Sequence, residues 1–305
     1  KNAKLELFRH LARSPRKILA GSALPKSVVV NADDDAAKDF LAIPIGAENS
    51  TLTSKAEDGQ KWIYTISGSA KYQGPLPRER QISAEDLELT ATGSTFEVGD
   101  QTMTLALPGR YNVENALAAI TVARALGVAL PVAADGLKNF MTMPGRFEFI
   151  ASNAPFKVLV DYAPEPASLA QLYQALALIP HKRLIHVLGS AGGGRDLARR
   201  PILGEMAGKR AEIVIVTNED PYDDDPAVII NQVAAGARQA GKKDSETLFE
   251  IKDRRAALQK ALTLAASGDL VLATGKGCEQ AIMIEKGKKI PWDEREQFRT
   301  LLSEM

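Results

Sequence analysis

The stretch RLIHVLGSAGGGRDLARRP, residues Arg183–Pro201, decides the fold of the second half of the chain. An apolar run typical of a strand leads into glycines and then into a basic segment typical of a helix. A mononucleotide phosphate loop needs Lys and then Ser or Thr after its last glycine, but Arg195 and Asp196 follow Gly194. The glycine spacing does not give the dinucleotide pattern G-x-G-x-x-G either. The turn suits a substrate carboxylate or phosphate, which Arg195 can bind bidentately, or it is a glycine turn beside a solvated arginine.

The same alternation continues on both sides of this stretch. Apolar runs that predict short strands are FKVLVDY, EIVIVTN, TLFEIK and DLVLATG, with helical segments between them. Continuous apolar strands separated by helices predict a parallel sheet covered on both faces, with ligands bound at the carboxyl ends of the strands. The segments that follow the predicted strands are dense in charge and glycine: 161–163, 189–196, 218–221, 253–255 and 275–279.

The first part of the chain has a different pattern. Alternating runs predict strands within 27–35, 61–67, 86–91, 94–98 and 102–107, and apolar spacing predicts helices over 112–128 and within 131–141. Pro144 and Gly145 then break the pattern. We therefore predict two domains, 1–143 and 144–305, the second of which folds by itself.

Composition excludes several classes of protein. The 305 residues are 45% hydrophobic and 25% charged, which argues against disorder and coiled coil. The formal net charge is zero, so no global electrostatic attraction to nucleic acid or an anionic membrane is expected. No membrane-spanning run or signal peptide is found, and a single cysteine, Cys278, excludes an internal disulfide and fits the cytoplasm. The chain opens at Lys1 within a helical pattern, so we expect it to begin inside a longer protein.

Nine stretches together resemble the Mur ligase family, the ATP-dependent amide-forming enzymes of peptidoglycan synthesis. In chain order they are AKLELF, VVVNADDD, GRYNVENALAA, PGRFE, VDYAPEP, GGGRDLARRP, VTNEDPYDDDP, DRRAAL and GKGCE. The nearest branch adds the third stem-peptide residue to UDP-N-acetylmuramoyl-L-alanyl-D-glutamate. The resemblance implies an α/β fold: the C-terminal part of the central ATP-binding domain over 1–143, then a Rossmann-like, amino-acid-binding domain with a mostly parallel sheet over 144–305.

The resemblance also implies the chemistry. ATP would phosphorylate the substrate carboxylate, and the amino group of a diamino acid would attack the acyl phosphate, with Mg²⁺ as cofactor. The family's Gly-Lys-Thr phosphate loop is absent from this sequence, so we expect the chain alone to be inactive. We expect a cytoplasmic monomer that binds UDP-MurNAc-dipeptide. The alternatives are a folylpolyglutamate or cyanophycin synthetase-like ligase, and a non-catalytic module that keeps the ligand cleft.

The resemblance assigns five residues to ATP and Mg²⁺: Lys4, Asn112, Asn115, Arg146 and Asp161. Lys4 matches a lysine that is carbamylated in the family, which would turn a repelling ammonium into oxygen ligands for Mg²⁺. Asn112 and Asn115 lie one helical turn apart and would contact adenine or ribose, although Asn112 could instead be an N-cap. Arg146 would reach an ATP phosphate. Asp161 ends a strand near the nucleotide, where Pro164 replaces the usual histidine of the motif.

Five further residues are assigned to the incoming amino acid: Arg195, Glu219, Asp220, Gly275 and Glu279. Arg195 would take the α-carboxylate, while Asp220 and Glu279 would attract the distal ammonium. Diaminopimelate-adding members carry an arginine where this chain has Tyr222, which favours L-lysine over meso-diaminopimelate.

Two alternatives concern the neighbouring charges. The acidic loop could instead cap the helix after Pro226, and Arg254 or Arg255 could supply the missing cation. Arg199 and Arg200 are predicted to lie on a helix face outside the site.

Overall fold

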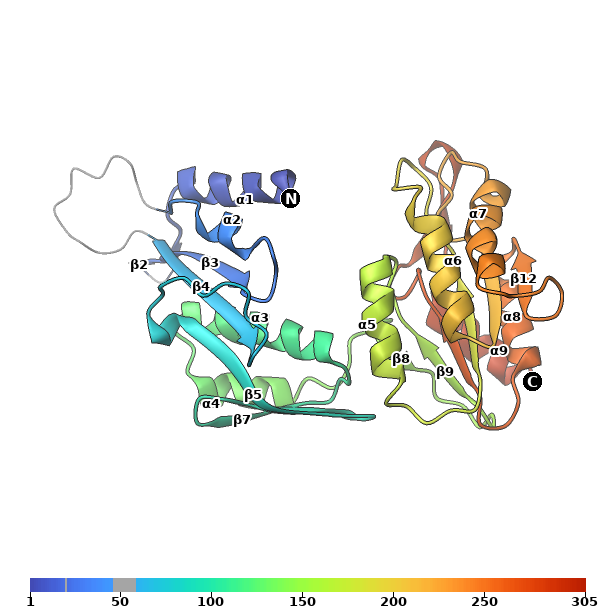
Figure 1. Cartoon of the computed structure of the whole chain (residues 1–305), viewed down its shortest axis with the longest axis horizontal. Helices are drawn as coiled ribbons and strands as arrows, with labels where there is room; N and C mark the ends of the chain where they lie inside the picture. Colours follow the sequence, from blue (N-terminus) through green and yellow to red (C-terminus); the bar gives the residue numbers. More distant parts are fainter. Residues whose placement is uncertain (20, 46–58) are drawn as a thin grey trace. The chain divides into compact units, whose positions relative to one another are not determined.

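The computed structural model describes residues 1–305 except residue 20 and residues 46–58. The chain divides into two compact units, an N-terminal unit of Lys1–Met141 and a C-terminal unit of Thr142–Met305 (Figure 1). The division lies close to the predicted boundary. Within the described residues, none of the helices has the length and apolar character needed to span a bilayer.

The N-terminal unit is built on a five-stranded sheet in the order β3-β4-β5-β6-β7. The first three strands are parallel, and the last two continue as antiparallel hairpins. Its elements are α1 (Asn2–Arg13), β1 (Ile18–Leu19), β2 (Ser22–Ala23), β3 (Lys26–Asn31), α2 (Ala37–Leu41), β4 (Gly59–Ile66), the 3-10 turn η1 (Arg78–Arg80), β5 (Gln81–Thr90), β6 (Gly93–Val98), β7 (Gln101–Leu105), α3 (Arg110–Ala125) and α4 (Leu130–Lys138).

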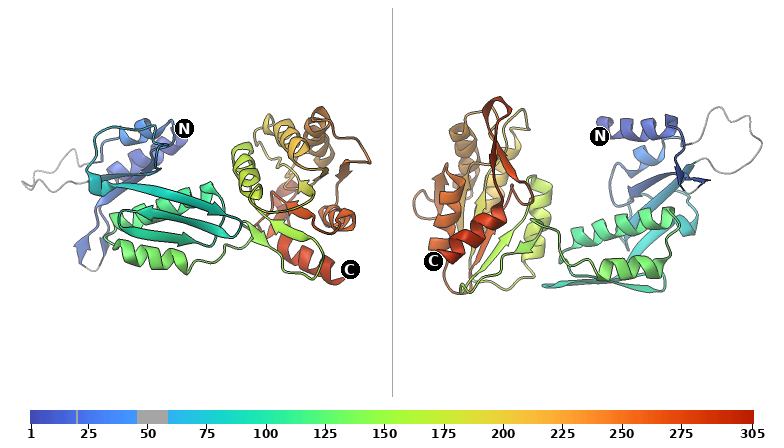
Figure 2. Two further views of the ribbon diagram at one scale, coloured as in Figure 1. Left: turned by 60° about the horizontal axis from the view of Figure 1, so that its bottom comes forward. Right: turned by 180° about the vertical axis from the view of Figure 1, so that it is seen from behind.

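Helix α3 anchors the core of this unit. Its apolar positions Val113, Leu117 and Ile120 recur at helical spacing and pack with Phe96 and Met103 of the sheet. Helix α4 joins them on the same face, while α1 and α2 pack against the other face through a second apolar cluster (Figure 2). Truncating Leu117, which is fully buried, to alanine would cost about 2–5 kcal/mol.

The C-terminal unit has a six-stranded sheet in the order β12-β11-β10-β13-β9-β8, all parallel except the short edge strand β8. This confirms the predicted mostly parallel sheet. Its elements are β8 (Glu148–Phe149), β9 (Lys157–Val160), α5 (Pro166–Leu176), β10 (Leu184–Leu188), α6 (Arg199–Arg210), β11 (Ile213–Thr217), α7 (Pro226–Gln239), β12 (Leu248–Ile251), α8 (Arg254–Leu264), β13 (Leu270–Ala273), β14 (Ala281–Met283), the 3-10 turn η2 (Glu285–Gly287), β15 (Lys289–Pro291) and α9 (Glu294–Ser303).

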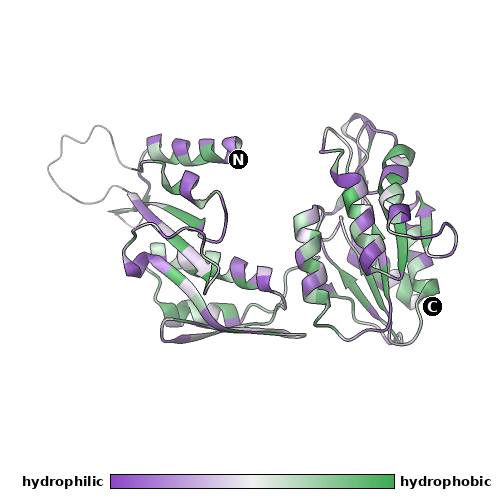
Figure 3. Cartoon of the chain, viewed as in Figure 1, coloured by the Kyte–Doolittle hydropathy of each residue, from purple (hydrophilic) through white to green (hydrophobic). Residues whose placement is uncertain are grey.

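Helices cover both faces of this sheet, which is why the central strands β10, β11 and β13 are mostly apolar and are buried along their whole length (Figures 1 and 3). In β10, Ile185 and Val187 pack with residues of α8 and α9, whereas His186 points to Tyr173 of α5 on the opposite face. Helices α6 and α7 lie on the α5 side (Figure 1). The helices thus cover the two faces of the sheet, and the connecting loops lie at the carboxyl ends of the strands.

The antiparallel ribbon of β14 and β15 has no counterpart in the sequence predictions. Its strands have three residues each, too few to show a periodic pattern. The ribbon nevertheless reaches the carboxyl edge, because Met283 N–H donates to Asp220 Oδ1 at 2.7 Å.

Candidate functional site

Four loops meet at the carboxyl edge of the C-terminal sheet. Strand β13 lies between β9 and β10, so the loop after β13 is flanked by the loops that follow those two strands. Gly275 N–H donates to Tyr162 O at 2.8 Å, and Gly192 N–H donates to Asp220 O at 2.8 Å. The predicted segments after β9, β10, β11 and β13 are therefore in direct contact.

Glycines allow these loops to approach closely. A Cβ added at Gly192 would lie 2.2 Å from Pro221 O, and one added at Gly275 would lie 2.2 Å from Glu219 Oε2. Gly275 also has a φ of +100°, which a side chain would strain. Since Gly192 N–H is bonded within the protein, the glycine turn packs against the loop after β11, while Arg195 beside it is exposed.

A buried lysine lies between two of the predicted carboxylates. Lys276 is completely buried, and its Nζ donates to Asp220 Oδ1 at 2.8 Å and to Glu279 Oε2 at 2.6 Å. The structure thus brings Asp220 and Glu279 together around an ammonium group of the chain itself. Lys276 is not among the predicted site residues, although it lies in the glycine-rich segment 275–279 that follows the buried strand β13.

Glu279 is the more accessible member of this group. Its side chain keeps 35% of its exposure, against 9% for Asp220. Its other oxygen, Oε1, accepts the Tyr162 hydroxyl at 3.2 Å, and the exposed Arg146 guanidinium lies 4.3 Å from the centre of the Tyr162 ring. Burial and the nearby Glu279 raise the pKa of Tyr162 to about 12, so the hydroxyl remains a donor.

Two buried carboxyl groups at this edge have raised pKa values. Burial raises the pKa of Glu219 to about 7, although Arg254, Arg199 and Lys276 oppose the shift. Burial likewise raises the pKa of Asp161 to about 6, and its Oδ2 accepts Phe147 N–H at 2.8 Å. Both groups therefore change protonation near neutral pH.

Arg254 is held by an ion pair and by hydrogen bonds to backbone carbonyls. It is buried, it pairs with Glu294 at 2.6 Å, and it donates to Asn218 O at 2.9 Å and Thr274 O at 2.8 Å. These bonds hold the loops after β11 and β13 together. Whether Arg254 supplies a cation to a ligand stays a prediction. Arg255 instead bonds Gln297 and Glu304.

Arg199 and Arg200 begin helix α6, in line with the predicted helix, and both are buried. Arg199 donates to Ser190 Oγ at 3.2 Å and contacts Glu165. Arg200 donates to Gln232 Oε1 at 2.7 Å and Asp224 Oδ2 at 3.2 Å. Their guanidinium groups tie α6 to the elements around it.

The acidic loop also contains Tyr222. Its φ is +51°, and its N–H donates to Met283 O at 3.1 Å. Asp225 caps α7, as its side chain accepts Ala227 N–H, so the predicted capping role belongs to the end of the loop. Asp220 is not part of that cap, because its carboxylate faces Lys276.

In the N-terminal unit, α3 does not present Asn112 and Asn115 in the same way. Asn112 is buried and donates its amide to Pro108 O at 2.8 Å, whereas Asn115 is exposed. Gly109, and not Asn112, is the N-cap of α3. Lys4 is exposed on α1, and no group of three His, Cys, Asp or Glu residues in the described ranges could hold a metal ion.

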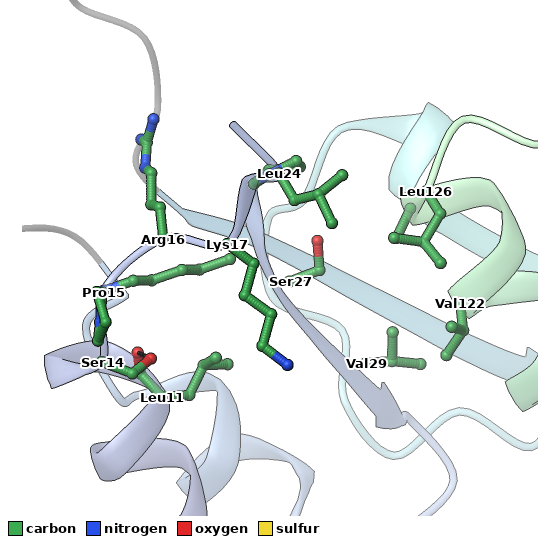
Figure 4. Close-up of a pocket in the computed structure, with 13 residues that line it drawn as sticks. Leu11, Ser14, Pro15, Arg16, Lys17, Leu24, Ser27, Val29, Val122 and Leu126 are labelled. Atoms are coloured by element: carbon green, nitrogen blue, oxygen red, sulfur yellow. Dashed lines mark hydrogen bonds between the residues drawn. The ribbon is translucent and has the colours of Figure 1, made fainter. Parts of the chain in front are cut away.

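The N-terminal unit also has an apolar pocket of about 420 Å³ (Figure 4). It lies between the end of α1, strand β3 and the end of α3, with Leu11, Leu24, Val29, Val122 and Leu126 among its lining residues. It is lined by none of the residues predicted to bind ATP, Mg²⁺ or the amino acid.

Comparison with known proteins identifies the family. The Mur ligase middle domain matches residues 2–123, and the Mur ligase glutamate ligase domain matches residues 145–277. The UDP-N-acetylmuramyl-tripeptide synthetase of Roseiflexus sp. (strain RS-1) is 40% identical over 285 residues, which are 92% of this chain and 51% of that protein. The UDP-N-acetylmuramoyl-L-alanyl-D-glutamate--2,6-diaminopimelate ligase of Caldanaerobacter subterraneus is 35% identical, covering 88% of this chain and 53% of its own length.

A solved structure of a UDP-N-acetylmuramoyl-L-alanyl-D-glutamate--2,6-diaminopimelate ligase is similar in fold. Its TM-score is 0.51 at 26% identity, covering 99% of this chain and 56% of that one. The chain thus spans about half the length of the relatives that it matches.

Proposed function

The chain belongs to the Mur ligase family, and from this we propose that it is part of an ATP-dependent ligase that adds the third amino acid to UDP-MurNAc-L-Ala-D-Glu. The observation that carries the proposal is the acidic cluster at the carboxyl edge of the C-terminal sheet. Relatives named as tripeptide synthetase and as diaminopimelate ligase support this branch of the family.

The cluster has the charge needed to attract an amino group. Glu219, Asp220 and Glu279 surround one buried cation, Lys276, so the four groups carry a net negative charge when ionised. The charges of Arg254 and Arg199 are balanced by Glu294 and Glu165. A unit charge 4 Å from an opposite one gains about 4 kcal/mol near a protein surface.

Arg195 supplies the complementary group. It is exposed at the end of the glycine turn, which packs on the loop carrying Asp220. A guanidinium can bind the α-carboxylate of an amino acid through two parallel hydrogen bonds. The arrangement then fits a diamino acid whose α-carboxylate binds Arg195 while its ammonium groups face the acidic cluster.

L-Lysine fits this arrangement better than meso-diaminopimelate. Tyr222 offers no charge, and Arg254 is held by Glu294, so a second substrate carboxylate would lack a cation from either. Leaving a buried carboxylate unpaired costs several kcal/mol, whereas the lysine side chain has no such group. We propose L-lysine as the preferred substrate.

ATP is proposed to contact Arg146 and Asp161 of the C-terminal unit and Asn112 and Asn115 of the N-terminal unit. Arg146 and Asn115 are exposed and can bond a ligand directly. Asn112 can contribute only its amide oxygen and remaining N–H while it bonds Pro108 O. Lys4 as a carbamylated Mg²⁺ ligand stays a prediction.

The test is a ligation assay with the whole protein that contains this chain. ATP, UDP-MurNAc-L-Ala-D-Glu and either L-lysine or meso-diaminopimelate are supplied, and the UDP-linked product and phosphate are measured. We expect a tripeptide product and a kcat/KM at least tenfold higher for L-lysine. Faster incorporation of diaminopimelate would reject the lysine preference, and absence of product with every amino acid would reject the function.

A further inference from the structure

The carboxylates at the carboxyl edge of the C-terminal sheet differ in whether they accept a hydrogen bond from the protein. Four of them accept protein hydrogen bonds: Asp161 from Phe147, Asp220 from Lys276 and Met283, Glu279 from Lys276 and Tyr162, and Glu294 from Arg254 and Trp292. Within the described part of the chain, the Glu219 carboxylate accepts none, although the residue is only 5% exposed. Its oxygens are not among the fully buried side-chain atoms without a partner in the described residues, so the unbonded carboxylate is accessible to solvent.

The position of Glu219 places it at the junction of the glycine loops. It follows β11 by two residues, and its carboxylate lies against Gly275, where an added Cβ would be 2.2 Å from Oε2. A Cβ added at Gly189 would lie 3.0 Å from the Cβ of Glu219. Neither glycine carries a side chain that could cover the carboxylate.

The cations near Glu219 are already used by other groups. Arg254 bonds Glu294, Arg199 bonds Ser190 and contacts Glu165, and Lys276 bonds Asp220 and Glu279. They act on Glu219 through charge without bonding it. The unpaired carboxylate is therefore available to a donor that arrives with a ligand.

We propose that Glu219 is a catalytic residue of the ligase and accepts the proton of the attacking amino group. The proposal rests on the proposed function. The amino acid arrives as an ammonium ion, which has no lone pair and cannot attack. Its N–H bond breaks, the proton goes to the Glu219 carboxylate, and the freed lone pair forms the N–C bond at the acyl phosphate carbon. The C–O bond to phosphate then breaks, phosphate leaves with the bonding pair and takes the second proton from the new N–C nitrogen, and Glu219 returns its own proton to solvent.

The surroundings of Glu219 suit this exchange. Burial raises its pKa to about 7, and the charged groups that face it are Arg254 on α8, Arg199 on α6, Lys276 after β13 and Asp220 on its own loop. The charge of Glu219 also helps to raise the pKa of Tyr162, which follows β9. A base whose pKa lies near the working pH both accepts and releases a proton readily.

The experiment separates proton transfer from the earlier steps. In the whole protein, Glu219→Gln is assayed with ATP, UDP-MurNAc-L-Ala-D-Glu and either L-lysine or hydroxylamine, which is largely unprotonated at neutral pH and needs no base. We expect kcat with L-lysine to fall at least 100-fold while hydroxamate formation stays within about threefold of wild type. Glu246→Gln, at an exposed glutamate, is the control and should leave both rates unchanged.

Several results would overturn the proposal. One is an unchanged kcat with L-lysine in Glu219→Gln. Another is an equal loss of both products in a variant whose thermal transition matches wild type. The wild-type protein gives a test that does not depend on the variant's folding: its kcat/KM for L-lysine should rise with pH through about 7, and a flat profile would also overturn the proposal. If wild-type protein forms neither hydroxamate nor amide, the proposed function fails instead.

Discussion

At the scale of one residue, the raised pKa of Glu219 predicts how the stability of the fold changes with pH. Its pKa is about 7 in the folded chain and 4.5 without the fold, so between these values the folded state binds more protons. Stability contributed by this group is therefore lost as pH rises from about 4.5 to 7. A shift of this size corresponds to about 3 kcal/mol. Urea unfolding at pH 4.5 and pH 8 measures this loss. The free energy of unfolding should fall less between the two pH values in Glu219→Gln than in wild type, by about this amount, whereas Glu246→Gln should behave as wild type.

That comparison between variants is needed because other groups titrate in the same range. Asp161, with a raised pKa, acts in the same direction as Glu219. His186 acts in the opposite direction, because burial lowers its pKa to about 3 and stability is lost as pH falls below its ordinary value. Both groups are present in wild type and variant, so their contributions cancel in the difference. Equal pH dependence of the two proteins would contradict the prediction.

Lys276 is the second residue with a distinct expected effect. Lys276→Met would leave Asp220 and Glu279 adjacent and without their shared cation. Breaking a buried ion pair by removing one partner costs about 3–5 kcal/mol, so the free energy of unfolding at pH 7 should fall by that amount. Lys209→Met removes an exposed pair with Glu205 and should cost less than about 1 kcal/mol. Similar losses in the two variants would show that the buried pair contributes no more to the free energy of unfolding than the exposed pair.

At the scale of the elements, the glycine loops determine how closely the strand ends approach. Gly192→Ala would place a methyl group 2.2 Å from Pro221 O, so either the glycine turn or the loop after β11 must move. We expect a loss of about 1–3 kcal/mol and a higher KM for the amino acid. Gly136→Ala is the control, since it lies in helix α4 with open space around it and should stabilise by about 0.5–1 kcal/mol. An unchanged KM in Gly192→Ala would argue against this loop as part of the amino-acid site.

At the scale of the whole molecule, the C-terminal unit has its own core. One apolar cluster joins its sheet to α8 and α9, and all its members lie between Ile150 and Leu302. We therefore expect residues 142–305, expressed alone, to unfold in one cooperative thermal transition, followed by the near-ultraviolet signal of Trp292. A gradual change without a transition would mean that this unit depends on the rest of the chain.

The sequence by itself determined the main strands and helices of the C-terminal unit and the sheet edge that carries the candidate site. Strands such as β10, β11 and β13 are runs of consecutive apolar residues, and a run of this kind is a local property. The parallel order of strands follows from the helices between them, so the loops after β9, β10, β11 and β13 could be placed at one edge. The Mur ligase resemblance and residues such as Asp220 and Glu279 also came from local motifs.

Only the tertiary structure decided which charges are paired. The Lys276–Asp220 bond joins residues 56 positions apart, and the Arg254–Glu294 pair joins residues 40 positions apart. The burial of Arg199 and Arg200, and the missing partner of Glu219, likewise depend on neighbouring elements. The sequence alone does not show whether a charged side chain is solvated or buried. Its partner and its pKa depend on burial and distance, and these are fixed only when strands and helices distant along the chain pack together.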